Sequence, residues 1–114
     1  MNDCLFCKII AGDIPSTKVY EDEKVYAFRD INPMAPTHVL VIPKQHVSGM
    51  SAIDEADDAL LATCLRCCRT VAQLEGVDKT GYRVVSNCGD DACQSVKHLH
   101  FHVLGGKKMA ESMA

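Results

Sequence analysis

Apolar and polar residues alternate with two different periods along the chain, and these periods predict its elements. Two alternating runs flank the charged sequence EDEK within residues 18–30, which predicts a β-hairpin. Residues 37–44, THVLVIPK, form a β-branched run that Pro43 closes, and they predict a buried strand. Three further segments complete the prediction: a short helix or turn within residues 4–16, and strands within residues 81–87 and 95–106.

The helical period dominates one segment, residues 54–76. Asp54 is the expected N-cap, acidic residues follow it at the positive end of the helix dipole, and Gly76 is a natural stop. Two apolar seams run along this helix, and together they make a stripe wide enough for a sheet face, or for a sheet and a partner subunit. The seams consist of Leu60, Cys64, Cys67, Val71 and Leu74, and of Leu61, Leu65, Cys68 and Ala72.

The order of these elements predicts an α+β fold. One long helix, one short N-terminal helix and about five strands, without a repeated strand–helix unit, favour a mostly antiparallel sheet. The 114 residues suit a single domain spanning 1–114, with a core that needs no disulfides.

The composition limits which binding partners and which cellular compartment we expect. The net charge of −3 provides no basic surface for a nucleic-acid backbone, although a small phosphate needs only a few donors. No apolar run is long enough for a membrane helix, and no secretory leader is recognisable. The seven cysteines are an odd number, so we expect a cytoplasmic protein with free thiols or metal ligands.

Three histidines stand at every second position of KHLHFHVLGG, residues 97–106. On a strand, His98, His100 and His102 share one face, and the apolar residues between them share the other. Such a row is consistent with a solvated strand face, with a metal site, or with covalent catalysis by one imidazole. The row is unmixed with other polar residues, which disfavours the solvated face.

Other residues favour a phosphate near this row. The loop NPMAPTH delivers His38, and Asn87, Gln94 and Ser95 are short neutral donors that suit an anionic oxygen. Phe28 and Asp30 share a strand face, and this pair suits a base and a ribose diol.

The cysteines separate into groups with different expected roles. Cys4 and Cys7 have C-x-x-C spacing, which is typical of zinc ligands but requires two more. The cysteines of CLRCC, residues 64–68, lie on the apolar seams and are expected in the core or an interface.

The sequence HLHFHVL, residues 98–104, resembles the histidine triad (HIT) signature of alternating histidines and apolar residues. CLFCKIIAGDIP, AFRDINPMAPTHVLVIPKQH, GYRVVSN and QSVKHLHFHVLGG are similar to the Hint branch of that family. The resemblance covers almost the whole chain.

This resemblance implies a homodimer with a sheet extended across the interface, and a nucleotide-binding hydrolase or transferase that acts at the α-phosphorus of purine nucleoside phosphoramidates. It implies that His100 is the nucleophile, that His102 assists proton transfer, and that His38 supports the phosphate site. The implied nucleotide-binding residues are Asp30 at the ribose; Leu5, Phe6, Ile9, Ile14, Phe28, Ile31 and Leu40 around the base; and Asn87, Cys93, Gln94, Ser95, His100 and His102 near the phosphate. No cofactor is implied for the transfer itself.

A structural zinc is also implied by the resemblance, with Cys4, Cys7, His46 and His98 as its ligands. Two departures from the family pattern limit what the resemblance implies. Cys93 stands where relatives commonly have Gly, so the substrate range is not carried over, and the C-terminus lacks a Trp-containing ending, so the leaving-group preference is not carried over. Two alternatives remain, a dinucleoside polyphosphate hydrolase and a non-catalytic nucleotide-binding scaffold.

Overall fold

A computed structural model describes residues 3–112. Its centre is a five-stranded sheet with the order β1-β2-β3-β5-β4, in which every neighbouring pair is antiparallel. The strands are β1 (Lys18–Glu21), β2 (Val25–Arg29), β3 (Thr37–Pro43), β4 (Tyr82–Val85) and β5 (Phe101–Gly105). The α+β class and the mostly antiparallel sheet are therefore confirmed.

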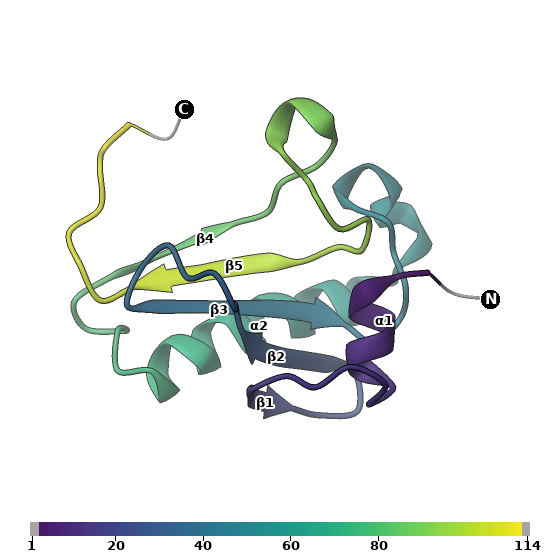
Figure 1. The fold of residues 1–114 in the computed structure, drawn as a ribbon, viewed down its shortest axis with the longest axis horizontal. Coiled ribbons are helices and arrows are strands. Elements are labelled where there is room, and N and C mark those ends of the chain that lie inside the picture. Colours follow the sequence, from purple (N-terminus) through teal and green to yellow (C-terminus); the bar gives the residue numbers. More distant parts are fainter. Residues whose placement is uncertain (1–2, 113–114) are drawn as a thin grey trace.

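The two α-helices cover opposite faces of the sheet (Figure 1). The long helix α2 (Asp58–Leu74) lies on one face, and the short helix α1 (Leu5–Ile10) lies on the other. All seven residues of β3 are buried, because this strand is central and has a helix on each side. This explains why the sequence THVLVIP is a continuous apolar run rather than an alternating one.

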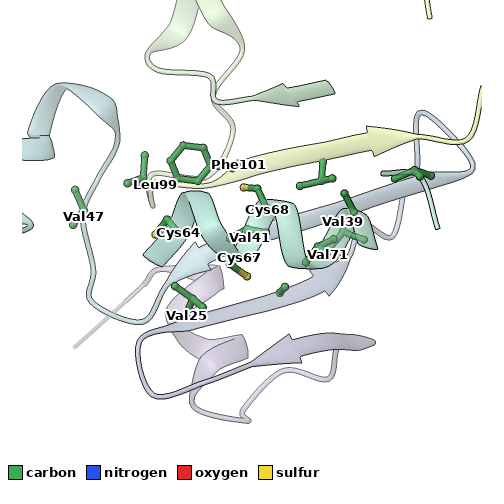
Figure 2. Packing of buried hydrophobic residues seen from close by; sticks show 14 residues of the cluster. Val25, Val39, Val41, Val47, Cys64, Cys67, Cys68, Val71, Leu99 and Phe101 are labelled. Carbon is green, nitrogen blue, oxygen red and sulfur yellow. The ribbon is translucent and has the colours of Figure 1, made fainter. Parts of the chain in front are cut away.

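Alternation along the strands divides the core into two clusters. Val39, Val41 and Phe101 belong to the larger cluster, where they pack against the α2 cysteines and Val71 (Figure 2). Leu40 belongs to the second cluster, which includes Phe6 of α1. The sheet face beneath α1 also carries His38 and His102, so this second cluster borders the candidate functional site.

Helix α2 begins later than the sequence predicts. Asp57, not Asp54, is the N-cap, and its carboxylate accepts a hydrogen bond from the Leu60 amide at 2.8 Å. Asp54 lies in a preceding 3-10 turn, Met50–Glu55, and Ala56 is extended between the turn and α2. Residues 54–58 contain four acidic side chains, and the sequence alone does not show which of them caps the helix. The path of the backbone, which is extended at Ala56, decides that Asp57 does.

The two apolar seams of α2 are not equally buried. Cys64, Cys67 and Cys68 are buried as predicted, but Leu65 and Leu74 are each 58% exposed. The stripe is therefore wider than the sheet covers, and its outer edge faces solvent in the single chain.

The last strand is shorter than predicted. β5 begins at Phe101, so His98 and His100 precede it. The backbone there bonds to loops instead: the Leu99 amide donates to the Val47 carbonyl at 2.6 Å, and the His100 carbonyl accepts from Ser86 Oγ at 2.8 Å. Leu99, Phe101 and Val103 still face the core, so the predicted alternation extends beyond the strand itself.

Across residues 3–112 there is no helix that is both long and apolar enough to cross a membrane.

The N-cap assignment makes a stability prediction. Asp57→Ala removes the carboxylate that accepts from Leu60, and it should lower the free energy of unfolding by about 1 kcal/mol. Asp54→Ala is the matched control and should change it by less than about 0.5 kcal/mol. Urea titrations of both variants measure this, and an equal loss in the two would show that Asp57 is not the cap.

Candidate functional site

The register between β3 and β5 places two histidines next to each other. Leu40 lies opposite His102, and His38 lies opposite Leu104, so His38 and His102 are diagonal neighbours on one sheet face. Their ring nitrogens, His38 Nε2 and His102 Nδ1, are 2.9 Å apart. A pair separated by 64 residues in the sequence is thus joined by strand pairing alone.

His100 lies beside this pair and is 5% exposed. Its ring centre is 5.0 Å from that of His102 and 5.0 Å from that of Phe6, which meets it edge-on. Its Nδ1 lies 2.7 Å from the backbone carbonyl of His98. A carbonyl only accepts, so Nδ1 carries the hydrogen and Nε2 of the neutral ring keeps its lone pair.

A cavity of about 290 Å³ adjoins these rings. Nε2 of His100 and Nε2 of His102 have no hydrogen-bond partner within residues 3–112. No fully buried side-chain nitrogen or oxygen among the described residues lacks a partner, so neither of these atoms is fully buried. These two atoms therefore reach the cavity surface. The lining residues are Leu5, Phe6, Ile9, Ile14, Pro15, Ser16, Phe28, Arg29, Asp30, Ile31, Asn32, Leu40, Ser95, Val96, His100 and His102.

Asp30 joins the apolar and the polar parts of this cavity. One carboxylate oxygen accepts from the Asn32 amide at 2.8 Å, and the other lies 3.4 Å from His38 Nε2. The cavity is thus apolar around Phe6 and Phe28 and polar toward the histidines. Such a division suits a ligand with one flat apolar end and one anionic end.

A second group of side chains lies at the N-terminal end of this histidine row. Donor atoms of Cys4, Cys7, His46 and His98 all lie within 4.8 Å of one another. Nε2 of the fully buried His98 donates to the Pro43 carbonyl at 2.8 Å, which leaves its Nδ1 unprotonated. Nδ1 faces Cys4 Sγ at 3.3 Å and Cys7 Sγ at 3.5 Å, and this set of two sulfurs and two imidazoles is one that zinc prefers.

The HIT domain family matches residues 11–109 of the chain. The chain belongs to the HIT domain family. It is 52% identical over 107 residues to the 14 kDa zinc-binding protein of Zea mays, which covers 92% of this chain and 83% of that protein. It is 46% identical over 107 residues to Adenylylsulfatase HINT1 of Arabidopsis thaliana, covering 92% of this chain and 72% of that protein.

The fold comparison agrees with the family assignment. A HIT family hydrolase from Clostridium thermocellum superposes with a TM-score of 0.95 at 45% identity, covering 100% of this chain and 99% of that one. The resemblance deduced from HLHFHVL is thereby confirmed for the family and for the fold.

Most of the predicted nucleotide-binding residues of this HIT chain line the cavity of about 290 Å³, but three do not. Asn87, Cys93 and Gln94 are not among the residues that line it. The side-chain amide of Gln94 donates to the Val96 carbonyl and accepts from the backbone N–H of Gly89 in its own loop, and it donates to the Ser48 carbonyl in the segment after β3. Gln94 therefore braces the loop that carries Ser95 to the cavity.

Five lining residues had no place in the sequence prediction: Pro15, Ser16, Arg29, Asn32 and Val96. Arg29 and Asn32 lie close to Asp30 in the sequence, and this proximity to a predicted site residue was a signal that could have found them. No sequence signal points to Ser16, because its position depends on how the segment after α1 passes β2. The Ser16 hydroxyl forms a hydrogen bond with the Tyr26 hydroxyl at 2.7 Å.

Cys93 adopts the left-handed backbone conformation, with φ 62° and ψ 37°. Glycine takes this conformation without steric cost, whereas a residue with a side chain adopts it rarely. The exposed thiol of Cys93 does not line the cavity.

The three cysteines of α2 are buried. Burial raises the pKa of Cys64 to about 11 and the pKa values of Cys67 and Cys68 to about 12. These three side chains are therefore neutral thiols that pack as small apolar groups.

A larger hollow, of about 560 Å³, lies between β4 and the C-terminal segment, lined by residues 80–83 and 106–111. It is lined by no histidine and no cysteine. His100 and His102 line the smaller cavity instead.

Burial keeps the site histidines neutral. It lowers the pKa of His100, where the hydrogen bond to the His98 carbonyl and then the negative charge of Asp30 offset it in part. It also lowers the pKa of His38, where the negative charge of Asp30 offsets it in part. For His102, burial and then the neighbouring histidines lower the pKa to about 4. Neutral rings are needed both for a nucleophilic nitrogen and for the hydrogen bonds described above.

These shifts predict that stability falls in mild acid. An unfolded histidine has a pKa of about 6.5, so between that value and about 4 the unfolded chain binds more protons at His102 than the folded chain does. The free energy of unfolding should therefore fall as the pH drops from about 6.5 to 4, by at most about 1.4 kcal/mol per pH unit for this ring. Denaturant titrations should show a shallower pH slope for His102→Asn; a slope equal to that of the wild type would contradict this assignment.

Proposed function

We propose that this protein cleaves adenylyl-type nucleotides at the α-phosphorus through a covalent intermediate on His100. The observation that carries the proposal is the hydrogen bond from His100 Nδ1 to the His98 carbonyl, which leaves a lone pair on the Nε2 atom that faces the cavity. The Arabidopsis relative is named an adenylylsulfatase, which supports an adenylyl substrate. The apolar walls around Phe6 and Phe28 suit a purine, and Asp30 suits the ribose hydroxyls.

In the first step, His100 Nε2 attacks the α-phosphorus and the bond to the leaving group breaks. The ring, now bonded at Nε2 and still carrying hydrogen at Nδ1, becomes cationic. The His98 carbonyl stabilises that charge, since a carbonyl oxygen accepts more strongly from a charged donor.

When the leaving group is an amine, it needs a proton as it departs. That proton comes from solvent water, while His102, which lines the cavity beside His100, donates a hydrogen bond from Nε2 to a phosphate oxygen. A second water then attacks the same phosphorus and the bond to His100 breaks. The proton that this water loses returns to solvent, the nucleoside monophosphate is released, and His100 is free again.

Purine nucleoside phosphoramidates are the substrates we propose first. Dinucleoside polyphosphates are the second candidates, because their leaving group is a nucleotide that the cavity of about 290 Å³ does not need to enclose.

We also propose that zinc binds to Cys4, Cys7, His46 and His98 in a closed structural site. Zinc in such a site supplies no chemistry to the reaction; it ties α1, which begins at Leu5 directly after Cys4, to the end of the histidine row. His98 then serves two sites at once, with Nδ1 toward the metal and its carbonyl toward His100. Thiolate ligands must stay reduced, which agrees with a cytoplasmic location.

A homodimer is the third proposal. β4 is an edge strand with Tyr82 and Val84 partly exposed, and Leu65 of α2 is exposed as well. Val84 pairs with Val103, whose side chain lies in the cluster beneath α2, so Val84 points to the α2 side. A second chain that pairs with β4 would cover these apolar side chains.

Removal of the nucleophile should abolish turnover. His100→Ala should lower kcat/KM for adenosine 5'-phosphoramidate by roughly 10³-fold or more, with AMP release followed by chromatography. Binding of AMP, measured by calorimetry, should persist in the variant. An inert wild type that still binds AMP would refute the enzymatic proposal and favour a nucleotide-binding scaffold.

Zinc should be present at about one ion per chain in native mass spectra. The double variant Cys4→Ser/Cys7→Ser should lose it, because serine hydroxyls replace the two thiolate ligands. Cys88→Ser/Cys93→Ser is the matched control and should keep its zinc. Retention of zinc in the first variant would show that the ligands lie elsewhere.

Sedimentation equilibrium at micromolar concentration should show a dimer for the wild type. Val84→Glu should shift it toward the monomer, because a buried charge opposes association. A wild-type monomer would contradict the third proposal.

A further inference from the structure

The loop between β2 and β3, residues 30–36, contains a backbone amide with an unusual partner. Met34 exposes 74% of its surface, so its side chain packs against little. Its backbone N–H, however, donates to Nδ1 of the buried His38 at 3.0 Å. The main chain at Met34 therefore contacts the histidine network although its side chain does not.

A backbone amide can only donate, so this bond determines the hydrogen on His38. Nδ1 accepts, and the single hydrogen of the neutral ring must lie on Nε2. That hydrogen faces His102 Nδ1 at 2.9 Å, with the Asp30 carboxylate at 3.4 Å on the same side. His102 Nδ1 is then an acceptor, and the hydrogen of the neutral His102 ring lies on Nε2.

We propose that the Met34 backbone amide is a positioning group that sets the tautomer of His102 through His38. The direction of the chain of hydrogen bonds makes His102 Nε2 a donor toward the cavity, where the anionic phosphate of a nucleotide accepts hydrogen bonds. This inference rests on the proposed function for its chemical consequence, but not for the tautomers themselves.

The same geometry argues against a cation between Asp30, His38 and His102, whose donor atoms lie within 4.8 Å of one another. A metal on His38 Nε2 would require the hydrogen of that ring to move to Nδ1. There it would point at the Met34 N–H, at a nitrogen–nitrogen distance of only 3.0 Å. Two donors would face each other without an acceptor, so the cluster favours a hydrogen-bond chain over a metal site.

Loss of the amide hydrogen allows the chain to reverse. His38 would carry hydrogen at Nδ1, His102 would donate from Nδ1 to His38 Nε2, and His102 Nε2 would keep a lone pair. His102 would then accept rather than donate at the cavity surface. An anionic phosphate oxygen would then meet a lone pair instead of a donor, so a nucleotide would bind more weakly, whereas a nucleoside without a phosphate would be little affected.

The test replaces Met34 by its α-hydroxy acid, which converts one amide into an ester and removes only the N–H. The same replacement at Met109, in the C-terminal segment, is the matched control. Met34→Pro, which also lacks the N–H, is the second variant. All chains are labelled with ¹⁵N at histidine and compared in long-range ¹H–¹⁵N spectra near neutral pH, after thermal unfolding has shown that each is folded.

We expect His38 and His102 to be in the Nε2–H form in the wild type and in the Met109 ester, and to shift toward the Nδ1–H form in both Met34 variants. We expect the Kd of AMP, measured by calorimetry, to rise roughly tenfold in these variants, because one hydrogen bond to the charged phosphate is lost. The Kd of adenosine should change much less, because adenosine carries no phosphate.

Unchanged tautomers in a folded Met34 ester would overturn the proposal, whatever the affinities. An equal loss of affinity for AMP and for adenosine would overturn the claim that His102 Nε2 donates to the phosphate. A wild type that binds AMP but is inactive on adenosine 5'-phosphoramidate would overturn the proposed enzymatic function alone, since the spectra judge the tautomers independently.

Discussion

A neutral imidazole has two nitrogens and one hydrogen, and in this protein the backbone decides which nitrogen carries it. The His98 carbonyl sets Nδ1–H on His100, the Pro43 carbonyl sets Nε2–H on His98, and the Met34 amide sets Nε2–H on His38. Each side-chain role depends on this choice. A lone pair at His100 Nε2 can attack, and a lone pair at His98 Nδ1 can bind a metal.

The sheet supplies these backbone groups in register. β3 provides His38 at its start and the Pro43 carbonyl at its end, and β5 pairs along the same edge of β3. A shift of one residue between these two strands would turn the histidines toward α2 and bring apolar side chains into the cavity. The core beneath α2 opposes such a shift, because it buries Val39, Val41 and Val103 completely.

His98 is the residue where the two sites meet. Its ring belongs to the cysteine cluster, whereas its carbonyl contacts His100, the proposed nucleophile. Phe6 makes a second connection, since it lies between Cys4 and Cys7 in the sequence and packs edge-on against His100. The N-terminal segment therefore helps to hold in place the ring that we propose as the nucleophile.

Sequence reasoning predicted the elements that depend on period. The alternation of HLHFHV correctly separated the histidine face from the core face, and the β-branched run at β3 correctly predicted a buried strand. It failed where several residues of one type compete, as with Asp54 and Asp57 at the helix cap. It also could not find the Met34 amide, because a backbone donor has no residue type and its partner is fixed only by the path of the loop.

The position of the hydrogens is the most direct test of this account. Long-range ¹H–¹⁵N spectra of the wild-type protein near neutral pH report the tautomer of each histidine ring. We predict that, of His38, His98, His100 and His102, only His100 is in the Nδ1–H form. A spectrum with His100 in the Nε2–H form would place a hydrogen on the proposed nucleophilic nitrogen and would contradict the account.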